Sequence, residues 1–451
     1  MTTLPRPLRH LRNARLADGS IVDVELSGSL VRSVRPAGST DAGTSATATT
    51  ADAASGAAAD TLDLDGFLLL TAPAEPHAHL DKALSWDLID PPMGDLGLAI
   101  DSWKRYSAVM TVDSIADRAR SQALAMLQNG TTAIRCHVDI LQGDQPMRGV
   151  QALLRVRDEL RGIVDIELTA LAGPTVPDAH IHEALDLGVE LVGGAPHLAD
   201  DPDADLRRLL AIAERRSRGV DMHTDESLHG AVTMHTLAEV VRDWPASRPV
   251  TAGHCVRLGT LEPVELDAVI REMVLSNIGV VTLPITNLYL QGWEHPVSTP
   301  RGLTAVRALL DAGVRLGAGA DNVRDPFNPV GRSDALETAS LLVTAGHLTL
   351  DEAYAAVSDG ARSVMSLPAA GVAVGAKAEL LAVRGGSLSD VIANAPADRY
   401  VVHEGRLVAQ SEVRRQIALP AASSMSEGAP TVSITQQTPS APAPDPILET
   451  R

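Results

Sequence analysis

Eight short apolar segments, separated by longer amphipathic stretches, repeat through the middle of the 451-residue chain. Each segment has the length of a β-strand, and the stretches between them have the apolar spacing of a one-sided helix. The segments span residues 68–79, 131–140, 164–173, 188–196, 219–225, 248–255, 278–285 and 314–321. Strands that alternate with helices predict an α/β fold with a parallel sheet, and eight such units fit a closed (β/α)8 barrel. A doubly wound open sheet is the competing fold, but no glycine-rich phosphate-binding turn follows the first strand.

Strand-like segments also flank the predicted barrel at both ends of the chain. Residues 11–38 alternate apolar and polar side chains between glycine-containing turns, and the same pattern returns in residues 371–383 and 398–410. Short strands at both ends of a barrel are most simply joined in one domain. We therefore expect a small β-sandwich built from both termini.

The chain divides on this basis into four predicted parts. Low-complexity sequence predicts a flexible loop inside the first part, and a composition rich in Ser, Pro, Thr and Ala predicts a disordered tail. The parts are residues 1–70 and 366–415 for the β-sandwich, with the flexible loop at 39–60, residues 71–365 for the barrel, and residues 421–451 for the tail.

Composition and charge limit the partners that we expect. The chain has 57 acidic and 38 basic residues, a formal charge of −19, which argues against nucleic acid and against an anionic membrane surface. No stretch reaches the roughly 18 uninterrupted apolar residues of a membrane span, and the N-terminus lacks the apolar core of a signal peptide. Only Cys136 and Cys255 are present, so a disulfide framework is not expected. We expect a cytoplasmic homo-oligomer that acts on a small molecule.

Histidine and aspartate side chains stand at the ends of several predicted strands. His77 and His79 are two residues apart and so point to the same side of the first barrel strand. His223, His254 and Asp321 end three later strands. The carboxyl ends of barrel strands meet at one mouth, where active sites lie. Imidazole and carboxylate groups with an open coordination position are typical of a catalytic zinc or ferrous iron site.

Other polar residues near strand ends have a structural interpretation. A lone histidine at a strand end is more often a packed or capping residue than a ligand. The residues with this interpretation are His137, His197, His229 and His235. Glu226, which follows His223 by three residues, either moves protons beside the metal or is an acid in the first turn of the next helix.

Six stretches, in this order, resemble the cytosine deaminase branch of the amidohydrolase superfamily. They are "EPHAHLDKAL", "GTTAIRCHVD", "HTDES", "AGHC", "TNLYLQG" and "GADNVRDPFNPVGRSD", and the similarity extends from about Leu62 to about Gln410. The resemblance implies a (β/α)8 barrel, a small β-sandwich from both termini, and a single Fe²⁺ or Zn²⁺ ion.

The same resemblance implies roles for individual residues. The metal ligands would be His77, His79, His223 and Asp321. His254 would hold or orient the attacking hydroxide, Glu226 would carry a proton to the ring, and Gln291 would lie near the substrate. The implied reaction is hydrolytic deamination of a cytosine-like nitrogen heterocycle, with release of ammonia or an amine.

The chain departs from the family at three positions near the expected substrate. Cytosine deaminases have a glutamine that reads the amide edge of the pyrimidine, and here the position falls at about Gly173. Asn322 replaces the acid that follows the ligand aspartate, and Phe327 replaces a tryptophan of the pocket. These changes leave the metal ligands intact but predict that cytosine itself is a poor substrate.

Two other functions stay open from the sequence. One is a cyclic amide hydrolase of the dihydroorotase or hydantoinase type, which usually bridges two metals with a carboxylated lysine. The chain has only Lys82, Lys104 and Lys377, none of them at the end of a middle strand. The other is a barrel that has lost catalysis and only binds a small ligand.

Overall fold

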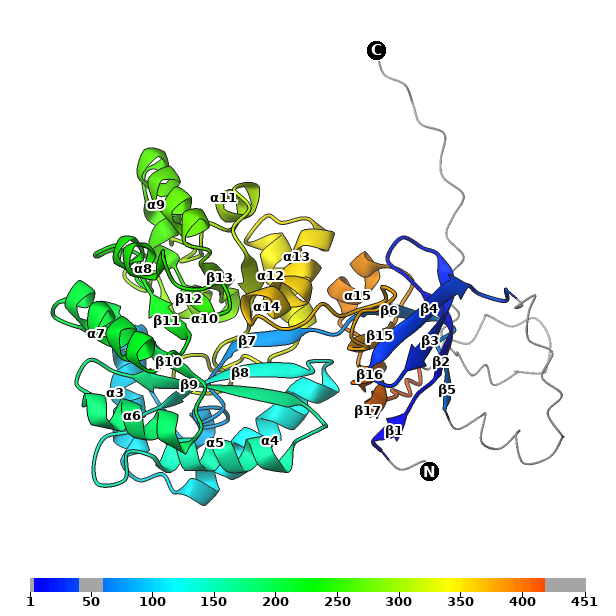
Figure 1. Cartoon of the computed structure of the whole chain (residues 1–451), viewed down its shortest axis with the longest axis horizontal. Coiled ribbons are helices and arrows are strands. Elements are labelled where there is room, and N and C mark those ends of the chain that lie inside the picture. Colours follow the sequence, from blue (N-terminus) through cyan, green and yellow to red (C-terminus); the bar gives the residue numbers. More distant parts are fainter. Residues whose placement is uncertain (1–3, 40–59, 418–451) are drawn as a thin grey trace, which may run out of the picture.

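The computed structural model describes residues 4–39 and 60–417, which form a barrel and a smaller β domain beside it (Figure 1). Apart from its two end residues, the flexible loop predicted at 39–60 lies outside the described residues, and so does the tail predicted at 421–451.

Eight parallel strands form the barrel wall in the order in which they occur in the chain. They are β7 (Ala74–Ala78), β8 (Ala133–Asp139), β9 (Asp165–Ala172), β10 (Leu191–Gly194), β11 (Val220–Thr224), β12 (Val250–His254), β13 (Gly279–Thr282) and β14 (Leu316–Ala318). Every pair of neighbouring strands is parallel. The barrel predicted from the alternation of strands and helices is confirmed.

The barrel closes between its first and last strands at a seam built by Glu75 and Gly319. Ala78 and Asp321 form an isolated parallel bridge across this seam. The buried Glu75 carboxylate accepts hydrogen bonds from the backbone N–H groups of His77, at 3.2 Å, and of the residue before Asp321, at 2.9 Å. A Cβ atom at Gly319 would lie 2.1 Å from Glu75 Oε1, so this approach requires glycine. The seam therefore fixes Asp321 beside the strand that carries His77.

Helices follow the strands and cover the outside of the barrel (Figure 1). They are α2 (Trp86–Ile89), α3 (Leu96–Ser107), α4 (Val112–Gln128), α5 (Arg148–Glu159), α6 (Asp178–Leu187), α7 (Pro202–Arg215), α8 (Met234–Val241), α9 (Pro263–Leu275), α10 (Pro284–Leu290), α11 (Val306–Asp311), α12 (Ala335–Thr344), α13 (Leu350–Val357) and α14 (Asp359–Val364), with the 3₁₀ helices η1 (Pro196–Leu198) and η2 (Val256–Thr260). Their apolar faces pack on the strands in one large core. In residues 4–39 and 60–417 no helix has both the length and the apolar character needed to cross a membrane.

A nine-stranded sheet built from both ends of the chain forms the β domain. Its strands are β1 (Arg6–Pro7), β2 (His10–Arg15), β3 (Ile21–Ser27), β4 (Leu30–Pro36), β5 (Thr61–Asp63), β6 (Phe67–Thr71), β15 (Leu380–Arg384), β16 (Arg399–His403) and β17 (Arg406–Ser411), and α15 (Leu388–Asn394) connects β15 to β16. β6 lies between β2 and β15, and β1 pairs with β17. Leu11, Phe67, Leu380 and Leu407 share one buried core, so both termini build the domain as predicted.

The first predicted barrel strand, residues 68–79, is in fact two strands in two different sheets. β6 belongs to the β domain and β7 to the barrel, with Pro73 between them. The N–H of Ala72 bonds to the carbonyl of Glu379 at the β domain, whereas the carbonyl of Pro73 accepts from Thr132 at the barrel. Proline has no N–H to continue a ladder. The apolar run hides this crossing because both strands are buried.

Buried polar contacts join the β domain to the barrel. The guanidinium of Arg399 in β16 lies 3.0 and 2.8 Å from the two carboxylate oxygens of Asp334, the N-cap residue of α12. Within the β domain, Nδ1 of His403 in β16 lies 2.8 Å from the carboxylate of Glu379. Arg362 of α14 lies 3.9 Å from the same Glu379 carboxylate.

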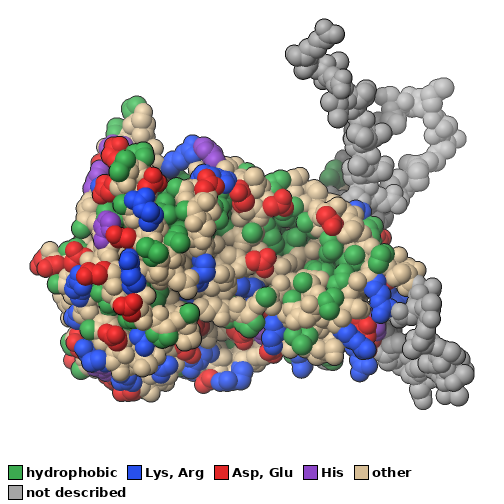
Figure 2. All heavy atoms as spheres, turned by 45° about the horizontal axis from the view of Figure 1, so that its top comes forward, with side chains coloured by type: hydrophobic (Ala, Val, Ile, Leu, Met, Phe, Trp, Pro, Cys, Tyr) green, Lys and Arg blue, Asp and Glu red, His purple; other side chains and the backbone are tan. Residues whose placement is uncertain are grey.

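On the face drawn in Figure 2, acidic and basic side chains are interspersed.

Candidate functional site

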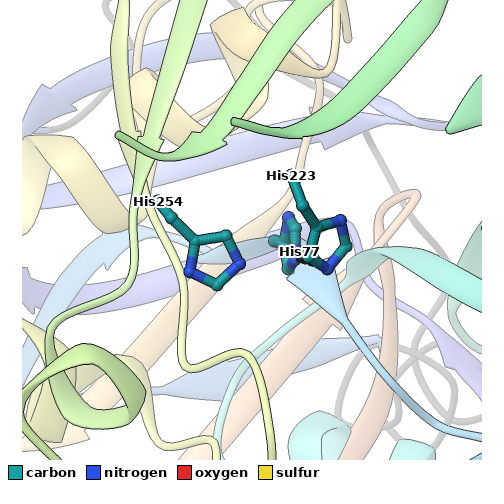
Figure 3. Close-up of side chains that lie close together, drawn as sticks. All are labelled: His77, His223 and His254. Carbon is teal, nitrogen blue, oxygen red and sulfur yellow. Dashed lines mark hydrogen bonds between the residues drawn. The ribbon is translucent and has the colours of Figure 1, made fainter. Parts of the chain in front are cut away.

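Three imidazole nitrogens and a carboxylate oxygen meet at the carboxyl ends of the barrel strands. Nε2 of His223 lies 3.2 Å from Nε2 of His77 and 3.2 Å from Nε2 of His79. Oδ1 of Asp321 lies 3.2 Å from Nε2 of His79 and 3.9 Å from Nε2 of His77. In Figure 3 the rings of His77 and His223 lie against each other, with the ring of His254 beside them. We call His77, His79, His223 and Asp321 the ligand group.

The ligand group has the spacing of a tetrahedral metal site. A zinc ion with bonds of about 2.1 Å holds its ligand atoms about 3.4 Å apart. The side chain of Asp321 is buried, yet neither of its oxygens has a hydrogen-bond partner among the described residues. A buried ionised carboxylate without a hydrogen-bond partner raises the free energy of the folded state unless a cation lies next to it. Geometry and donor chemistry therefore both fit one divalent metal ion.

Burial sets the protonation of the ligand group. It lowers the pKa of His77, His79 and His223 well below the ordinary value, and the charges of neighbouring histidines lower it further. Burial also raises the pKa of Asp321, and the negative charge of Glu226 adds to that effect. Metal ions bind neutral imidazole and ionised carboxylate, and the charge of a bound cation would favour ionisation of Asp321.

The backbone is strained where site residues leave their strands. His254 has a φ of 65° and Asp321 a φ of 63°. Asp225, between His223 and Glu226, has a φ of 51°. Positive φ is uncommon outside glycine, and such residues concentrate at functional sites. These turns direct the side chains from three strands toward one mouth.

Glu226 and His254 form a second part of the site, next to the ligand group. Oε1 of Glu226 lies 3.5 Å from Nδ1 of His254, and Oε2 lies 3.4 Å from Nε2 of His197. Burial opposes ionisation of Glu226, but the electrostatic interactions of its carboxylate with His254 and His197 outweigh burial and lower the pKa of Glu226. The next helix, α8, begins only at Met234, so Glu226 is not an acid of its first turn.

His254 presents one ring nitrogen to the ligand group. Its Nδ1 lies 3.0 Å from Oδ1 of Asn287, an atom that can only accept. Nδ1 therefore carries the proton, and Nε2 is left as an acceptor. That Nε2 atom has no hydrogen-bond partner among the described residues and lies 3.9 Å from Oδ2 of Asp321.

A cavity of about 840 Å³ opens from the ligand group toward α3 and the loop between β8 and α5. Three of the residues expected to contact the substrate, Gly173, Asn322 and Phe327, line it. A Cβ atom at Gly173 would meet nothing within 4 Å, so the space for a longer side chain is open. The volume lies in the upper part of the range of about 300–1,000 Å³ for pockets that hold drug-sized ligands.

Gln291 does not line this cavity. Its side-chain nitrogen donates to the backbone carbonyl of Glu226 at 2.6 Å, so it supports the loop that carries the acid. Asn322 does line the cavity, and its amide donates to Asp325 at 2.7 Å, which fixes the orientation of its side chain.

Three further residues at the site, Lys82, Asp139 and Trp103, were not predicted from the sequence. Nζ of Lys82 lies 2.7 Å from Oδ1 of Asp139 and 3.0 Å from Nδ1 of His79. Nε1 of Trp103 donates to Oδ2 of Asp139 at 2.6 Å, and all three residues line the cavity. Asp139 ends a barrel strand, which is the same signal that identified Asp321 and could have identified it. Trp103 lies in a helix, α3, so it does not have the strand-end position that marks the other site residues.

Two of the histidines interpreted as packed or capping residues lie at the site. The ring of His137 lies 4.0 Å from that of His77, centroid to centroid. His197, as described above, contacts Glu226. The other two, His229 and His235, are exposed.

The chain is similar to several known proteins in sequence and in fold. A family model described as "Amidohydrolase family" matches residues 96–409. The pterin deaminase of Rhizobium rhizogenes is 30% identical over 350 residues, which cover 75% of this chain and 80% of that protein. The structure of 5-methylcytosine deaminase from Klebsiella pneumoniae with 5-fluorocytosine has a TM-score of 0.78 at 25% identity and covers 92% of this chain and 100% of that one. The N-isopropylammelide isopropylaminohydrolase of Burkholderia multivorans has a TM-score of 0.72 at 28% identity, over 89% and 98% of the two chains.

Proposed function

The chain belongs to the amidohydrolase family, hydrolases that act on non-peptide C–N bonds, and from this we propose that it is a metal-dependent deaminase of an amino-substituted nitrogen heterocycle. The observation that carries the proposal is the meeting of the ligand group with Glu226 and His254 at the inner end of one large cavity. The substrate loses its exocyclic amino group, as ammonia or an amine, and gains a ring carbonyl from water.

One Fe²⁺ or Zn²⁺ ion would be held by His77, His79, His223 and Asp321. When bound, such an ion supplies a hydroxide nucleophile at neutral pH, because it lowers the pKa of water to roughly 7. A second metal bridged by a carboxylated lysine does not fit, because Lys82, Lys104 and Lys377 all lie outside the barrel strands.

The other side chains of the site would move and hold protons. Oδ2 of Asp321 and Nε2 of His254 have no hydrogen-bond partner among the described residues, so both can accept a proton from the attacking water. Glu226 would carry a proton to the ring nitrogen next to the carbon under attack. His197 and Gln291 hold its carboxylate and its backbone in place.

Pterins are the first substrate class to test. The cavity is larger than a single pyrimidine ring needs, and the space beside Gly173 is open. The relative from Rhizobium rhizogenes is named a pterin deaminase. A buried side-chain amide that reads the cytosine edge is missing at Gly173, so we expect cytosine to bind poorly.

The experiment is a measurement of ammonia or amine release by metal-replete protein from pterin, cytosine and an N-alkylated ammelide, with hydantoin as the cyclic amide. Turnover of an aminated ring, lost in Glu226→Gln with metal content unchanged, supports the proposal. Ring opening of hydantoin without amine release would favour the cyclic amide hydrolase instead. A fully metallated protein that binds these rings but turns over none of them would contradict the proposal in favour of a ligand-binding barrel.

A further inference from the structure

The lining of the cavity includes a buried guanidinium without a carboxylate partner. Arg148, the first residue of α5, lines the cavity and is 7% exposed. Its terminal nitrogens donate to two backbone carbonyls, those of Gln145 at 2.9 Å and of Ser107. Its Nε has no hydrogen-bond partner, and no carboxylate oxygen of the described residues lies within 4.0 Å of the guanidinium. A guanidinium has five N–H donors, so three remain after these two bonds.

Most other buried arginines of the described chain have a partner of opposite charge. Arg135, Arg362 and Arg399 each lie within 4.0 Å of a carboxylate. Arg118 has no such ion pair either, but it does not line the cavity. A buried charge is costly without a partner. Arg148 is therefore the buried arginine that a ligand in the cavity could reach and neutralise.

The surroundings of Arg148 also favour an anion. Lys104 of α3 also lines the cavity, three residues before Ser107, whose carbonyl accepts from Arg148, and its side chain is exposed. The N-terminus of α5 has no side-chain cap, and a helix N-terminus attracts negative charge. Of the acidic residues that line the cavity, Glu226 and Asp321 belong to its inner end, and Asp139 is paired with Lys82. The remaining one, Asp144, is exposed.

We propose that the substrate carries an anionic substituent, a carboxylate, on the side of its ring system away from the amino-bearing carbon, and that Arg148 and Lys104 bind this group. The inference rests on the proposed function, because the ligand group fixes where the amino-bearing carbon lies. Each terminal nitrogen of the Arg148 guanidinium keeps one N–H beyond its bond to a backbone carbonyl, and a planar guanidinium can donate two such N–H groups to one carboxylate. The substrate class is then a fused aminated heterocycle with a carboxylate arm.

The test compares kcat/KM for pterin with kcat/KM for pterin that bears a carboxylate on its pyrazine ring. We expect the wild type to prefer the carboxylate form. In Arg148→Met the ratio of the two values should fall about 10- to 100-fold, mainly through KM, as expected for loss of a hydrogen bond to a charged group. Arg148→Lys keeps the positive charge but lacks the planar guanidinium. Its ratio of the two kcat/KM values should therefore lie between the ratios of the wild type and of Arg148→Met. Arg155→Met, which removes an arginine of the same helix that does not line the cavity, should leave the ratio unchanged.

Purely structural damage in Arg148→Met would lower both values and leave their ratio unchanged, which would overturn the inference. Wild-type preference for uncharged pterin would overturn it as well. If neither pterin is deaminated, the proposed function fails for pterins, and binding still tests the anion site. The carboxylate compound should then raise the thermal unfolding temperature of the wild type more than pterin does, and Lys104→Met and Arg148→Lys should each reduce this difference. Equal protection by both compounds would contradict the anion site.

Discussion

Replacement of Asp334 by alanine should destabilise the whole protein, because it leaves a buried charge at the junction of the two domains. The side chains of Arg399 and Asp334 are 2% and 6% exposed. Without Asp334, the guanidinium keeps its bonds to backbone carbonyls, among them that of Asn129 at 2.6 Å. It loses its only counter-charge within 4.0 Å among the described residues. Removal of one partner of a buried ion pair typically costs about 3–5 kcal/mol.

The same substitution removes a helix cap. Oδ1 of Asp334 accepts the N–H of Leu336 at the start of α12, at 3.1 Å. Loss of an N-cap costs about 1 kcal/mol. We therefore expect Asp334→Ala to lower the free energy of unfolding by about 4–6 kcal/mol, a large part of the roughly 5–15 kcal/mol available to a folded protein.

Urea unfolding followed by circular dichroism measures this change, with linear extrapolation to water. The double variant Asp334→Ala/Arg399→Met removes the isolated charge as well, so it should be more stable than Asp334→Ala alone. Glu239→Ala breaks the exposed pair with Arg207, in which the two atoms are 2.6 Å apart, and should leave the midpoint unchanged. A loss below about 1 kcal/mol in Asp334→Ala would refute the reasoning, since it would mean that the buried charge finds another partner.

Four further predictions follow from the site and the domain junction. Glu226→Gln should keep the fold and the metal but lower kcat about 10²- to 10⁴-fold, and near-normal activity would show that Glu226 moves no proton in the reaction. Elemental analysis should find one divalent metal per chain, with activity lost on chelation and regained with Zn²⁺ or Fe²⁺, and a need for two equivalents would contradict the single site. Cytosine should be a poor substrate, so a kcat/KM of about 10⁴ M⁻¹s⁻¹ or more would show that another residue replaces the missing glutamine. Burial opposes the charge on His403, but its hydrogen bond to Glu379 outweighs burial and raises the pKa of His403. Burial also opposes the charge on Glu379, but the hydrogen bond with His403 outweighs burial and lowers the pKa of Glu379. The pair should therefore contribute most between about pH 4.5 and 6.5, and the extra thermal stability of wild type over His403→Gln should shrink as the pH rises above about 6.5 through the raised pKa. If the difference in thermal stability between wild type and His403→Gln stays constant from about pH 6 to about pH 9, this pH dependence is wrong.

The meeting of the strand-end histidines with Asp321 could be predicted because these residues occupy positions that sequence periodicity defines. The choice of four of them as the ligand group rested on the family resemblance. Parallel strands with intervening helices converge at their carboxyl ends, so strand-end residues as distant as His77 and Asp321 must come together once the fold is known. The same rule also covers Asp139, which ends a barrel strand but whose carboxylate contacts Lys82 and Trp103 rather than the ligand group.

Other features depend on packing that periodicity does not encode. Arg148 and Lys104 reach the cavity because of the course of the loop after β8 and the position of α3. The crossing from β6 to β7 at Pro73 was hidden inside one apolar run, since residues buried in either sheet have the same composition. His197 lies in a short 3₁₀ helix, whose direction toward Glu226 follows from tertiary contacts alone.

The placement of β6 in the β domain has a consequence for synthesis of the protein on the ribosome. β6, whose sequence is Phe-Leu-Leu-Leu-Thr, pairs along its length with β15, yet β15 begins about 300 residues later in the chain. At about 5–20 residues per second, the interval between the two strands is roughly 15 to 60 s. During that time an apolar strand edge has no native neighbour, and an unpaired edge is a site for association with other chains. A nascent chain of this protein therefore needs either early collapse of β6 onto the growing barrel or a chaperone that covers it until the last strands emerge.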